Sequence, residues 1–501
     1  MNKQAIVIGG GLGGLAAAIR LAADGNRVTV LEKNERAGGK LNIRSGMGYT
    51  FDTGPSILTM PWVLEQLFAS AGRRLSDYMT LRRVEPQWRT FYEDGTTIDV
   101  TADLPRMLEQ LSAVSPEDAS RFMDYLNYCQ QMYELCTKSF YSKSLTGLQD
   151  LRSLHSLKEL LAMDPMRTMH QGTERFLKDS KLKQLFDFFI MYIGSSPYAA
   201  PAVLSQLVHV QLGLGIYYVE GGMYNIARGM LRLLEELGVE VRTSAPVAAI
   251  NSRGKWATGV TLEDGTVMGA DLVVSNLEAI PTHHSLLKHH SQSAQTAKKL
   301  GKYAPAVSGL VLLLGVDRTY PQLQHHNFLF SQDPEREFHQ IFDLKMPADD
   351  PTVYIGVSSI NDRTQAPEGR QNLFVLTHVP PLAEGQSWED RTERYREVVL
   401  TKLERMGLSG LRSHIEFEYR FTPDDLRELY GANGGSIYGV VTDRKLNGGF
   451  KIPSQSELLH NLYFVGGSTH PGGGVPMVTL SAQLTADLIK QQQGKPASGL
   501  G

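Results

Sequence analysis

The first forty residues alternate between short apolar runs and glycine-rich turns. Residues 5–8 and 28–31 are short apolar runs of the kind that form buried parallel strands. Between them lies an alanine- and leucine-rich stretch that ends near Gly25 and predicts a helix. The order strand, glycine turn, helix and strand predicts a nucleotide-binding α/β unit at the start of the chain.

The first turn carries the dinucleotide-binding spacing of glycines at Gly9, Gly11 and Gly14. Gly9 permits a tight turn, Gly11 lets the backbone approach a pyrophosphate, and Gly14 lets the helix pack closely on the strand. Glu32 ends the second apolar run, where a carboxylate can accept hydrogen bonds from a ribose. The alternative is a glycine turn that binds no ligand.

A second glycine turn follows, with Arg36, Gly38, Gly39 and Lys40 after Glu32. This series resembles the E-x-x-x-R-x-G-G-R signature of amine-oxidase-like flavoproteins, with lysine where many members have arginine. The resemblance implies FAD rather than NAD as the cofactor.

The pattern beyond residue 50 predicts a second, mixed domain. A Gly/Pro loop at 46–56 is expected to pass close to the flavin, with a surface turn as the alternative. A hairpin is expected at 87–100, turning at Asp94-Gly95, and helices are expected over 103–190, 221–237 and 388–406. Strands are expected at 239–242, 247–250, 270–275, 307–316, 352–357 and 373–379. The chain is expected to close with a strand, a glycine loop and a helix over 461–489, with the helix starting near Val475. The later strands favour a mostly antiparallel sheet.

One stretch, 188–219, contains no Asp, Glu, Lys or Arg. It is long enough to span a bilayer, but Pro197 and Pro201 and several glycines interrupt it, which argues against a spanning helix. It suits the wall of an apolar substrate channel or a patch that dips into one leaflet of a membrane. A buried pair of core helices is the alternative.

Composition limits the remaining possibilities. A net charge of −3 with no long basic run gives no reason to expect a nucleic-acid partner. Cys129 and Cys136 are seven residues apart on an expected helix and are predicted to be buried, reduced core residues, which fits a cytoplasmic protein. Only four residues precede the first strand, so no leader is expected.

Three adjacent histidine pairs raise the question of a metal. They stand at 283–284, 289–290 and 325–326. Neighbouring side chains point in different directions and no carboxylate stands beside them at a ligand spacing, so no metal site is expected. The histidines are predicted to lie in loops or at helix ends.

Nearly the whole chain, from 5 to about 490, resembles the bacterial carotenoid desaturases, a family of FAD amine-oxidase-like flavoproteins. Besides the glycine turns, the segments FDTGP at 51–55, GGMY at 221–224 and THPGGGVP at 469–476 carry the resemblance. Within the family it is most similar to the diapocarotenoid oxygenase branch, on GPSILTMP at 54–61, QWR at 87–89 with DGTTID at 94–99, YAAPAVLS at 198–205, and VGGS at 465–468 with PMVTLS at 476–481. His470 departs from that branch and matches the desaturases.

The resemblance implies an enzyme that removes hydride from an allylic carbon of a linear carotenoid. The branch implies oxidation of a terminal methyl group, in a C30 carotenoid such as 4,4′-diaponeurosporene, to an aldehyde; desaturation is the alternative. A different flavin reaction, such as amine oxidation, or lipid binding without catalysis also stays open. No triad or carboxylate pair is present, and no catalytic residue is identified.

These inferences give an α/β Rossmann-like FAD domain with an interleaved α+β substrate domain and a helical, partly membrane-facing region. The expected segments are 1–86, 219–285 and 455–490 for the FAD domain, 87–218 for the helical region, 286–454 for the substrate sheet and 491–501 for a disordered tail. The expected FAD-binding residues are Gly9, Gly11, Gly13, Gly14, Glu32, Lys33, Arg36, Gly38, Gly39, Lys40, Gly54, Pro55, Ser56, Val247, Gly467, Gly474, Val475 and Pro476. A peripheral membrane location and a homo-oligomer are further expectations.

Overall fold

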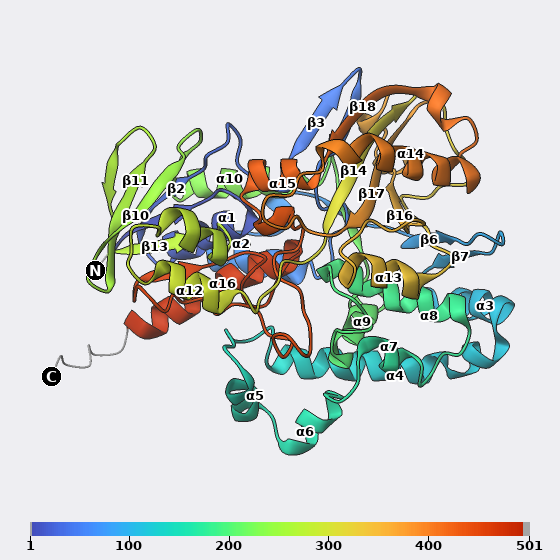
Figure 1. Cartoon of the computed structure of the whole chain (residues 1–501), viewed down its shortest axis with the longest axis horizontal. Helices are drawn as coiled ribbons and strands as arrows, with labels where there is room; N and C mark the ends of the chain where they lie inside the picture. The colour runs from blue at the N-terminus through green and yellow to red at the C-terminus, as the bar shows by residue number, and fades with distance from the viewer. Residues whose placement is uncertain (1–2, 494–501) are drawn as a thin grey trace.

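A five-stranded parallel sheet organises the nucleotide-binding half of the protein (Figure 1). The computed structural model describes residues 3–493. The strand order is β19 (Leu462–Phe464), β13 (Leu272–Ser275), β1 (Gln4–Ile8), β2 (Arg27–Leu31) and β9 (Glu240–Arg242). The helices α1 (Leu12–Ala23), α10 (Asn225–Glu236) and α16 (Val475–Gln493) pack together beside it. Strands from three distant parts of the chain therefore build one sheet.

Local sequence signals account for most of this unit. β1 lies in the middle of the sheet and buries Ala5, Ile6 and Val7 completely, as its continuous apolar run predicts. α1 and α16 begin and end within a few residues of the predicted positions. α10 begins later than predicted, at Asn225, because Gly221 and Gly222 both adopt positive φ and cannot continue a helix.

A seven-stranded sheet forms the second half of the molecule, in the upper part of Figure 1. Its order is β18 (Ile415–Phe421), β14 (Ser308–Val316), β17 (Gln371–Val379), β16 (Val353–Gly356), β15 (His326–Leu329), β6 (Trp88–Phe91) and β7 (Thr97–Val100). Every pairing is antiparallel except β15 with β6. This confirms the predicted hairpin at 87–100 and the mostly antiparallel sheet.

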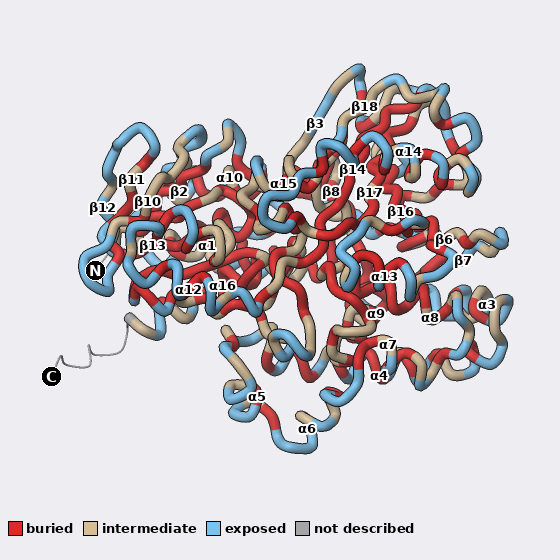
Figure 2. The backbone as a smooth tube through the Cα atoms, viewed as in Figure 1, coloured by how far each residue is buried: buried red, intermediate tan, exposed pale blue. Residues whose placement is uncertain are grey.

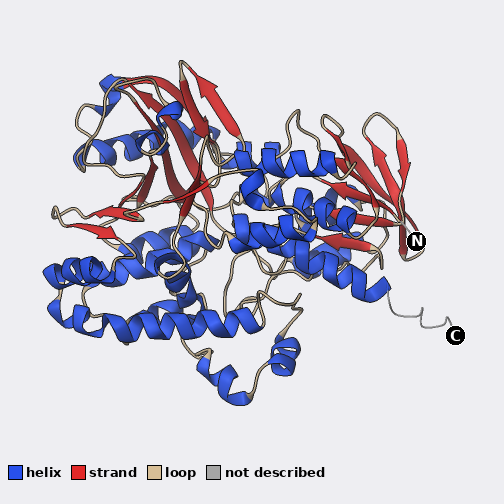
Figure 3. Cartoon of the chain, turned by 180° about the vertical axis from the view of Figure 1, so that it is seen from behind, coloured by secondary structure: helices blue, strands red, loops and turns tan. Residues whose placement is uncertain are grey.

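A helical layer lies below the seven-stranded sheet, and two short helices project from it (Figures 1 and 3). The layer contains α3 (Leu104–Val114), α4 (Pro116–Lys138), α7 (Met169–Thr173), α8 (Ser180–Asp187) and α9 (Gln206–Leu212). The projecting helices are α5 (Leu148–Leu154) and α6 (Leu157–Ala162). Cys129 and Cys136 are free and buried on α4, as predicted.

Within residues 3–493, the remaining elements are two antiparallel strand pairs, a three-stranded sheet and six further helices. They are the hairpin β3 (Ile43–Gly46) with β4 (Tyr49–Asp52), the pair β5 (Leu81–Arg83) with β8 (Tyr217–Val219), the antiparallel sheet β10 (Val247–Arg253), β11 (Trp256–Leu262) and β12 (Val267–Gly269), and the helices α2 (Trp62–Ser70), α11 (Ala279–Pro281), α12 (Ser293–Leu300), α13 (Pro334–Phe342), α14 (Glu389–Arg405) and α15 (Pro423–Tyr430). Among the described residues, no helix has both the length and the apolar character needed to cross a bilayer.

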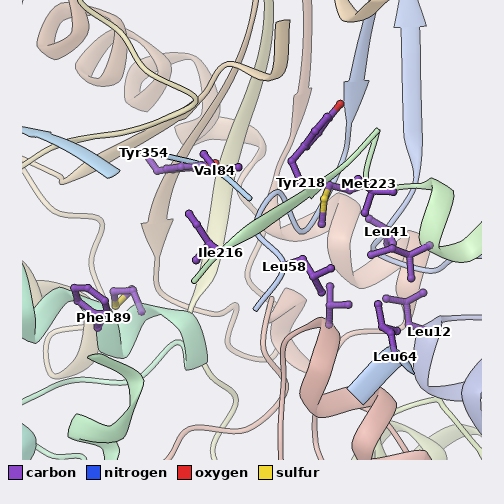
Figure 4. Packing of buried hydrophobic residues seen from close by; sticks show 14 of the residues in the cluster. Leu12, Leu41, Leu58, Leu64, Val84, Phe189, Ile216, Tyr218, Met223 and Tyr354 are labelled. Carbon is purple, nitrogen blue, oxygen red and sulfur yellow. The ribbon is translucent and has the colours of Figure 1, made fainter. Parts of the chain in front are cut away.

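The charge-free stretch 188–219 lies inside the protein (Figure 2). Only Gly213 in it is exposed, and Phe188, Phe189 and Ile190 are at most 5% exposed. Figure 4 shows Phe189 and Ile216 among the buried residues that extend toward Leu58 and Met223. The expectation that this stretch forms a membrane-facing patch is therefore wrong, because its apolar side chains are already covered by the protein.

Two further expectations need correction. His326 does not lie in a loop or at a helix end, because it is the first residue of β15; His325 lies in the loop just before it, and both are buried. His283 is also buried, packed against Phe464. Of the predicted tail 491–501, residues 491–493 are the last turn of α16, and the rest lies outside the described residues.

Candidate functional site

One long cavity of about 630 Å³ connects the two halves of the protein. At one end it is lined by Glu32, Asn34 and Val247, which stand at the edge of the parallel sheet and on β10. At the other end it reaches Leu148 and Met163, on and beside the projecting helices. A single continuous space therefore runs from a polar, glycine-lined end to an apolar end.

The first glycine turn forms the polar end. Gly9 adopts φ +92° and donates its N–H to the Leu31 carbonyl at 2.7 Å, which fixes the turn against β2. A Cβ on Gly14 would lie 2.0 Å from the Gly9 carbonyl oxygen. Gly14 is thus required for the turn itself, whereas Gly9, Gly11 and Gly13 line the cavity.

Asn276 is a site residue that the sequence analysis did not identify. It follows β13 directly, and its side chain lies between the N-terminal and C-terminal glycine loops. A Cβ on Gly11 would be 2.6 Å from its Nδ2, and one on Gly13 2.6 Å from its Oδ1. Its position at the carboxyl end of a parallel strand, where ligands bind in such sheets, is a signal that could have found it.

Glu32 is oriented toward the glycine turn. Its carboxylate is buried, accepting the Gly10 N–H at 2.7 Å and the Asn34 N–H at 2.9 Å. These bonds hold the side chain at the cavity wall, where a ribose hydroxyl can donate to it. Lys33 and Val247 line the same end, and contact of Val247 with the adenine stays a prediction.

The second glycine turn packs directly on the first. Gly38 donates to the Gly10 carbonyl at 2.8 Å, and a Cβ on Gly39 would lie 2.9 Å from the Gly11 Cα. Lys40 donates to the carbonyls of Ser436 and Ile437, at 2.8 and 3.0 Å. Burial lowers the pKa of Lys40, an effect that the carboxylate of Glu278 at 3.9 Å opposes.

Arg36 is placed differently from the other predicted residues. It is exposed, and its guanidinium donates to Asn42 and to the Ile43 carbonyl at 3.2 and 3.3 Å. It does not line the cavity, and neither does Gly14. All other predicted FAD-binding residues do: Gly9, Gly11, Gly13, Glu32, Lys33, Gly38, Gly39, Lys40, Gly54, Pro55, Ser56, Val247, Gly467, Gly474, Val475 and Pro476. Their individual roles stay predictions.

The middle of the cavity is formed by two loops from opposite ends of the chain. A Cβ on Gly54 would lie 2.0 Å from the Lys40 carbonyl oxygen, so the loop after β4 packs against the second glycine turn. Gly474 has φ +101° and precedes α16, whose first residues line the same space. A helix N-terminus favours an anion, as a reduced flavin is. The glycine cradle, Glu32 and this terminus together fit an extended FAD.

Asp52 joins two of the sequence segments that carry the family resemblance. Its carboxylate accepts the N–H groups of Met223 and Tyr224, both at 2.9 Å, and so ties the FDTGP segment to the GGMY segment at the start of α10. Burial raises the pKa of Asp52 to about 6, against the lowering effect of these two hydrogen bonds. Asp52 therefore holds in place the loop that is expected to contact the cofactor.

Replacing Asp52 with asparagine should flatten the pH dependence of stability. The pKa of Asp52 is raised to about 6 from 3.8, so its contribution to the free energy of unfolding is present below pH 4 and is lost as the pH rises through 6. The full effect of such a shift is roughly 3 kcal/mol, which partial exposure reduces to about 2 kcal/mol. Denaturant unfolding at pH 4 and pH 7 measures it; an equal change in stability between these pH values for both proteins would contradict the assignment.

The apolar half of the cavity is built by the seven-stranded sheet and the charge-free stretch. Val311, Phe328, Tyr354, Phe374 and Leu376 line it from the sheet. The stretch 188–219 supplies the opposite lining, with Phe188, Met191, Tyr192, Ile193, Pro201, Val203, Leu204, Gln206, Leu207 and Val210. This agrees with the channel-wall interpretation of that stretch.

Within the described part of the chain, no three His, Cys, Asp or Glu side chains are grouped as a metal site.

The model of the flavin containing amine oxidoreductases matches residues 12–490. The chain belongs to this family. A 4,4′-diapolycopene oxygenase of Methylomonas sp is 47% identical over 97% of the chain and 98% of that protein. A 4,4′-diaponeurosporene oxygenase of Staphylococcus haemolyticus is 44% identical over 99% and 98%. The crystal structure of an oxidoreductase from Methanosarcina mazei shares the fold, with a TM-score of 0.63 and 19% identity over 97% of the chain and all of that one.

Family membership and the site agree on the cofactor. The protein is an FAD-dependent oxidoreductase, as the paired glycine turns and Glu32 predict. Bound FAD supplies a two-electron acceptor for hydride. The residues that would hold it are the two glycine turns, Glu32 and the loop before α16.

Proposed function

We propose that this enzyme oxidises the terminal methyl group of a linear C30 carotenoid to an aldehyde. The observation that carries the proposal is the continuity of the cavity from the FAD-binding loops into a long, mainly apolar lining. Such a lining suits a hydrocarbon chain, which it positions and shields from water. The relatives named as oxygenases of 4,4′-diaponeurosporene and 4,4′-diapolycopene support the substrate class.

His470, the residue that favoured a desaturase, has a structural role in this protein. Its Nε2 lies 2.9 Å from the Phe140 carbonyl oxygen, and its ring stacks on Phe140. It therefore ties the loop before α16 to the segment after α4, whichever reaction the cavity supports. Desaturation stays the second candidate function, and His470 is the only observation that favours it.

The product formed from 4,4′-diaponeurosporene distinguishes the two reactions. Cells that accumulate this polyene and express the enzyme should yield the terminal alcohol and aldehyde. Labelled water or labelled dioxygen identifies the source of the oxygen, provided that the label is read on the alcohol, because aldehydes exchange with water. Conversion of a more saturated precursor to coloured polyenes without gain of oxygen would assign the enzyme as a desaturase instead.

We also propose that the projecting helices bind a lipid surface, from which the substrate enters. Leu157, Leu161 and Met166 are 73, 64 and 77% exposed, and α6 buries none of its residues. Leu148 of α5 is half exposed, while Leu148, Leu151 and Met163 line the end of the cavity. Figures 1 and 2 show α5 and α6 standing out from the body of the protein. This exposed apolar patch at the cavity end replaces the stretch 188–219 as the membrane-contacting surface.

Replacing Leu157, Leu161 and Met166 together with serine should reduce binding to phosphatidylethanolamine–phosphatidylglycerol vesicles at least tenfold. Each large apolar side chain contributes about 1.5–3 kcal/mol when fully buried. Co-sedimentation measures the bound fraction. Serine at Leu344 and Met346, which are about equally exposed at 52 and 51% but lie after α13, is the matched control and should bind normally. If the triple variant and the control bind the vesicles equally well, the surface on α6 does not bind the membrane.

A further inference from the structure

Among the residues of β17 that line the cavity, one is polar and the others are apolar. Successive residues of a strand point to opposite faces, and on β17 Phe374, Leu376 and His378 line the cavity. Leu373, Val375 and Val379 face the other way, into the separate core under α14. His378 therefore continues an apolar row with an imidazole.

The His378 ring has no polar partner within residues 3–493. None of its described neighbours hydrogen-bonds to the ring. Its Nε2 is enclosed by protein, so Nδ1 is the ring nitrogen that can face a ligand in the cavity. The rings of Phe188 and Tyr438 lie beside it, at centroid distances of 6.5 and 6.3 Å. Burial lowers the pKa of His378 to about 4, so the ring is neutral at physiological pH and presents one donor and one acceptor.

Tyr438 is the second polar group without a partner here. Among the described residues, none hydrogen-bonds to its hydroxyl, and the residue lines the cavity. Its backbone carbonyl packs on the loop before α16, because a Cβ on Gly473 would lie only 2.6 Å from it. Tyr438 thus places His378 next to the loop that belongs to the FAD site.

Two other tyrosine hydroxyls in the cavity differ from this pair. The Tyr354 hydroxyl is bonded to Ser56 Oγ at 2.7 Å and to His326 Nδ1 at 2.8 Å. The Tyr192 hydroxyl donates to Gln211 at 2.6 Å. These groups are satisfied within the protein. A polar group that lines an apolar cavity without a partner costs free energy, so two of them on neighbouring rings indicate a ligand with a polar atom.

We propose that His378 and Tyr438 bind the oxygen atom at the partly oxidised end of the substrate. The inference rests on the proposed function and deepens it. A hydrocarbon end offers no hydrogen bond and leaves both groups unpaired, whereas an alcohol or aldehyde oxygen pairs with them. The pair therefore favours the oxygenated intermediate over the starting hydrocarbon and retains it for the next oxidation. No covalent step is assigned to either side chain.

Binding of a matched ligand pair tests this proposal. The probes are 4,4′-diaponeurosporene and its terminal aldehyde, titrated into the purified holoenzyme without oxygen. His378→Phe and Tyr438→Phe should each weaken aldehyde binding about tenfold, the value of one hydrogen bond, and leave hydrocarbon binding unchanged or tighter. The visible absorption of the bound aldehyde should lose the red shift that a hydrogen bond to a conjugated carbonyl produces.

Tyr192→Phe is the control, because that hydroxyl is already bonded to Gln211. It should change the binding of both ligands by the same factor. His378→Gln restores a donor and should recover part of the aldehyde affinity. Equal losses for both ligands in His378→Phe and Tyr438→Phe would overturn the proposal. This outcome is distinguishable from failure of the proposed function, in which the wild-type enzyme itself adds no oxygen to the hydrocarbon.

Discussion

Replacing Gly11 with valine should give a folded protein that contains no FAD. A Cβ at this position would lie 2.6 Å from Asn276 Nδ2 and 3.8 Å from the Gly39 Cα, in the gap between the two glycine turns. The branched side chain would fill the space through which a pyrophosphate must approach the backbone. The visible flavin spectrum of the purified protein measures the effect, which we expect to be a complete loss of colour.

The same substitution at Gly269 provides the control. Gly269 is exposed on β12, and a Cβ there would meet only the Thr258 carbonyl oxygen, at 3.9 Å. Gly269→Val should keep its full flavin content, and circular dichroism should show both variants folded. If the Gly11→Val protein keeps an undiminished flavin spectrum, the assignment of the first glycine turn to the FAD site is wrong.

Replacing Leu376 with tryptophan should lower carotenoid conversion on the order of 100-fold while FAD stays bound. Leu376 stands between Phe374 and His378 on the cavity face of β17. The larger ring would occupy the apolar half of the cavity, and a displacement of about 1 Å from the reacting position can cost 100-fold in rate. Product formation per bound flavin is the measurement.

Thr377→Val is the matched control for this experiment. Thr377 is adjacent in sequence but not a lining residue, and valine keeps its shape while removing a hydroxyl that has no partner among the described residues. Its conversion should equal that of the wild type. If Leu376→Trp converts the polyene at the wild-type rate, the substrate does not pass along β17.

The nucleotide-binding part of the site could be predicted closely because its signals are local. Gly9, Gly11 and Glu32 lie within one strand–helix–strand unit, where backbone geometry dictates residue type. The start of α16 at Val475 was predictable for the same reason, because a glycine turn precedes a continuous helical pattern.

Other site residues depend on contacts that no local pattern encodes. Asn276 reaches the first glycine turn only because β13 pairs with β1 in the parallel sheet. His378 and Tyr438 meet because β17 pairs with β14 and the segment after α15 returns to Val307, to which Ile437 donates its N–H. Nothing in the spacing of these residues indicates that they are neighbours.

By itself, the sequence determined an FAD-binding α/β unit, an antiparallel substrate sheet and a long stretch without charges. Only the tertiary structure decided which apolar residues are covered. Apolar composition indicates that a segment avoids water, but it does not indicate whether protein or lipid covers the segment. Phe189 and Ile190 are enclosed by the protein, whereas Leu157 on α6 and Met166 in the turn after it are exposed. The packing of α8 and α9 under the seven-stranded sheet covers the apolar residues between them and places the apolar half of the cavity beside the FAD loops.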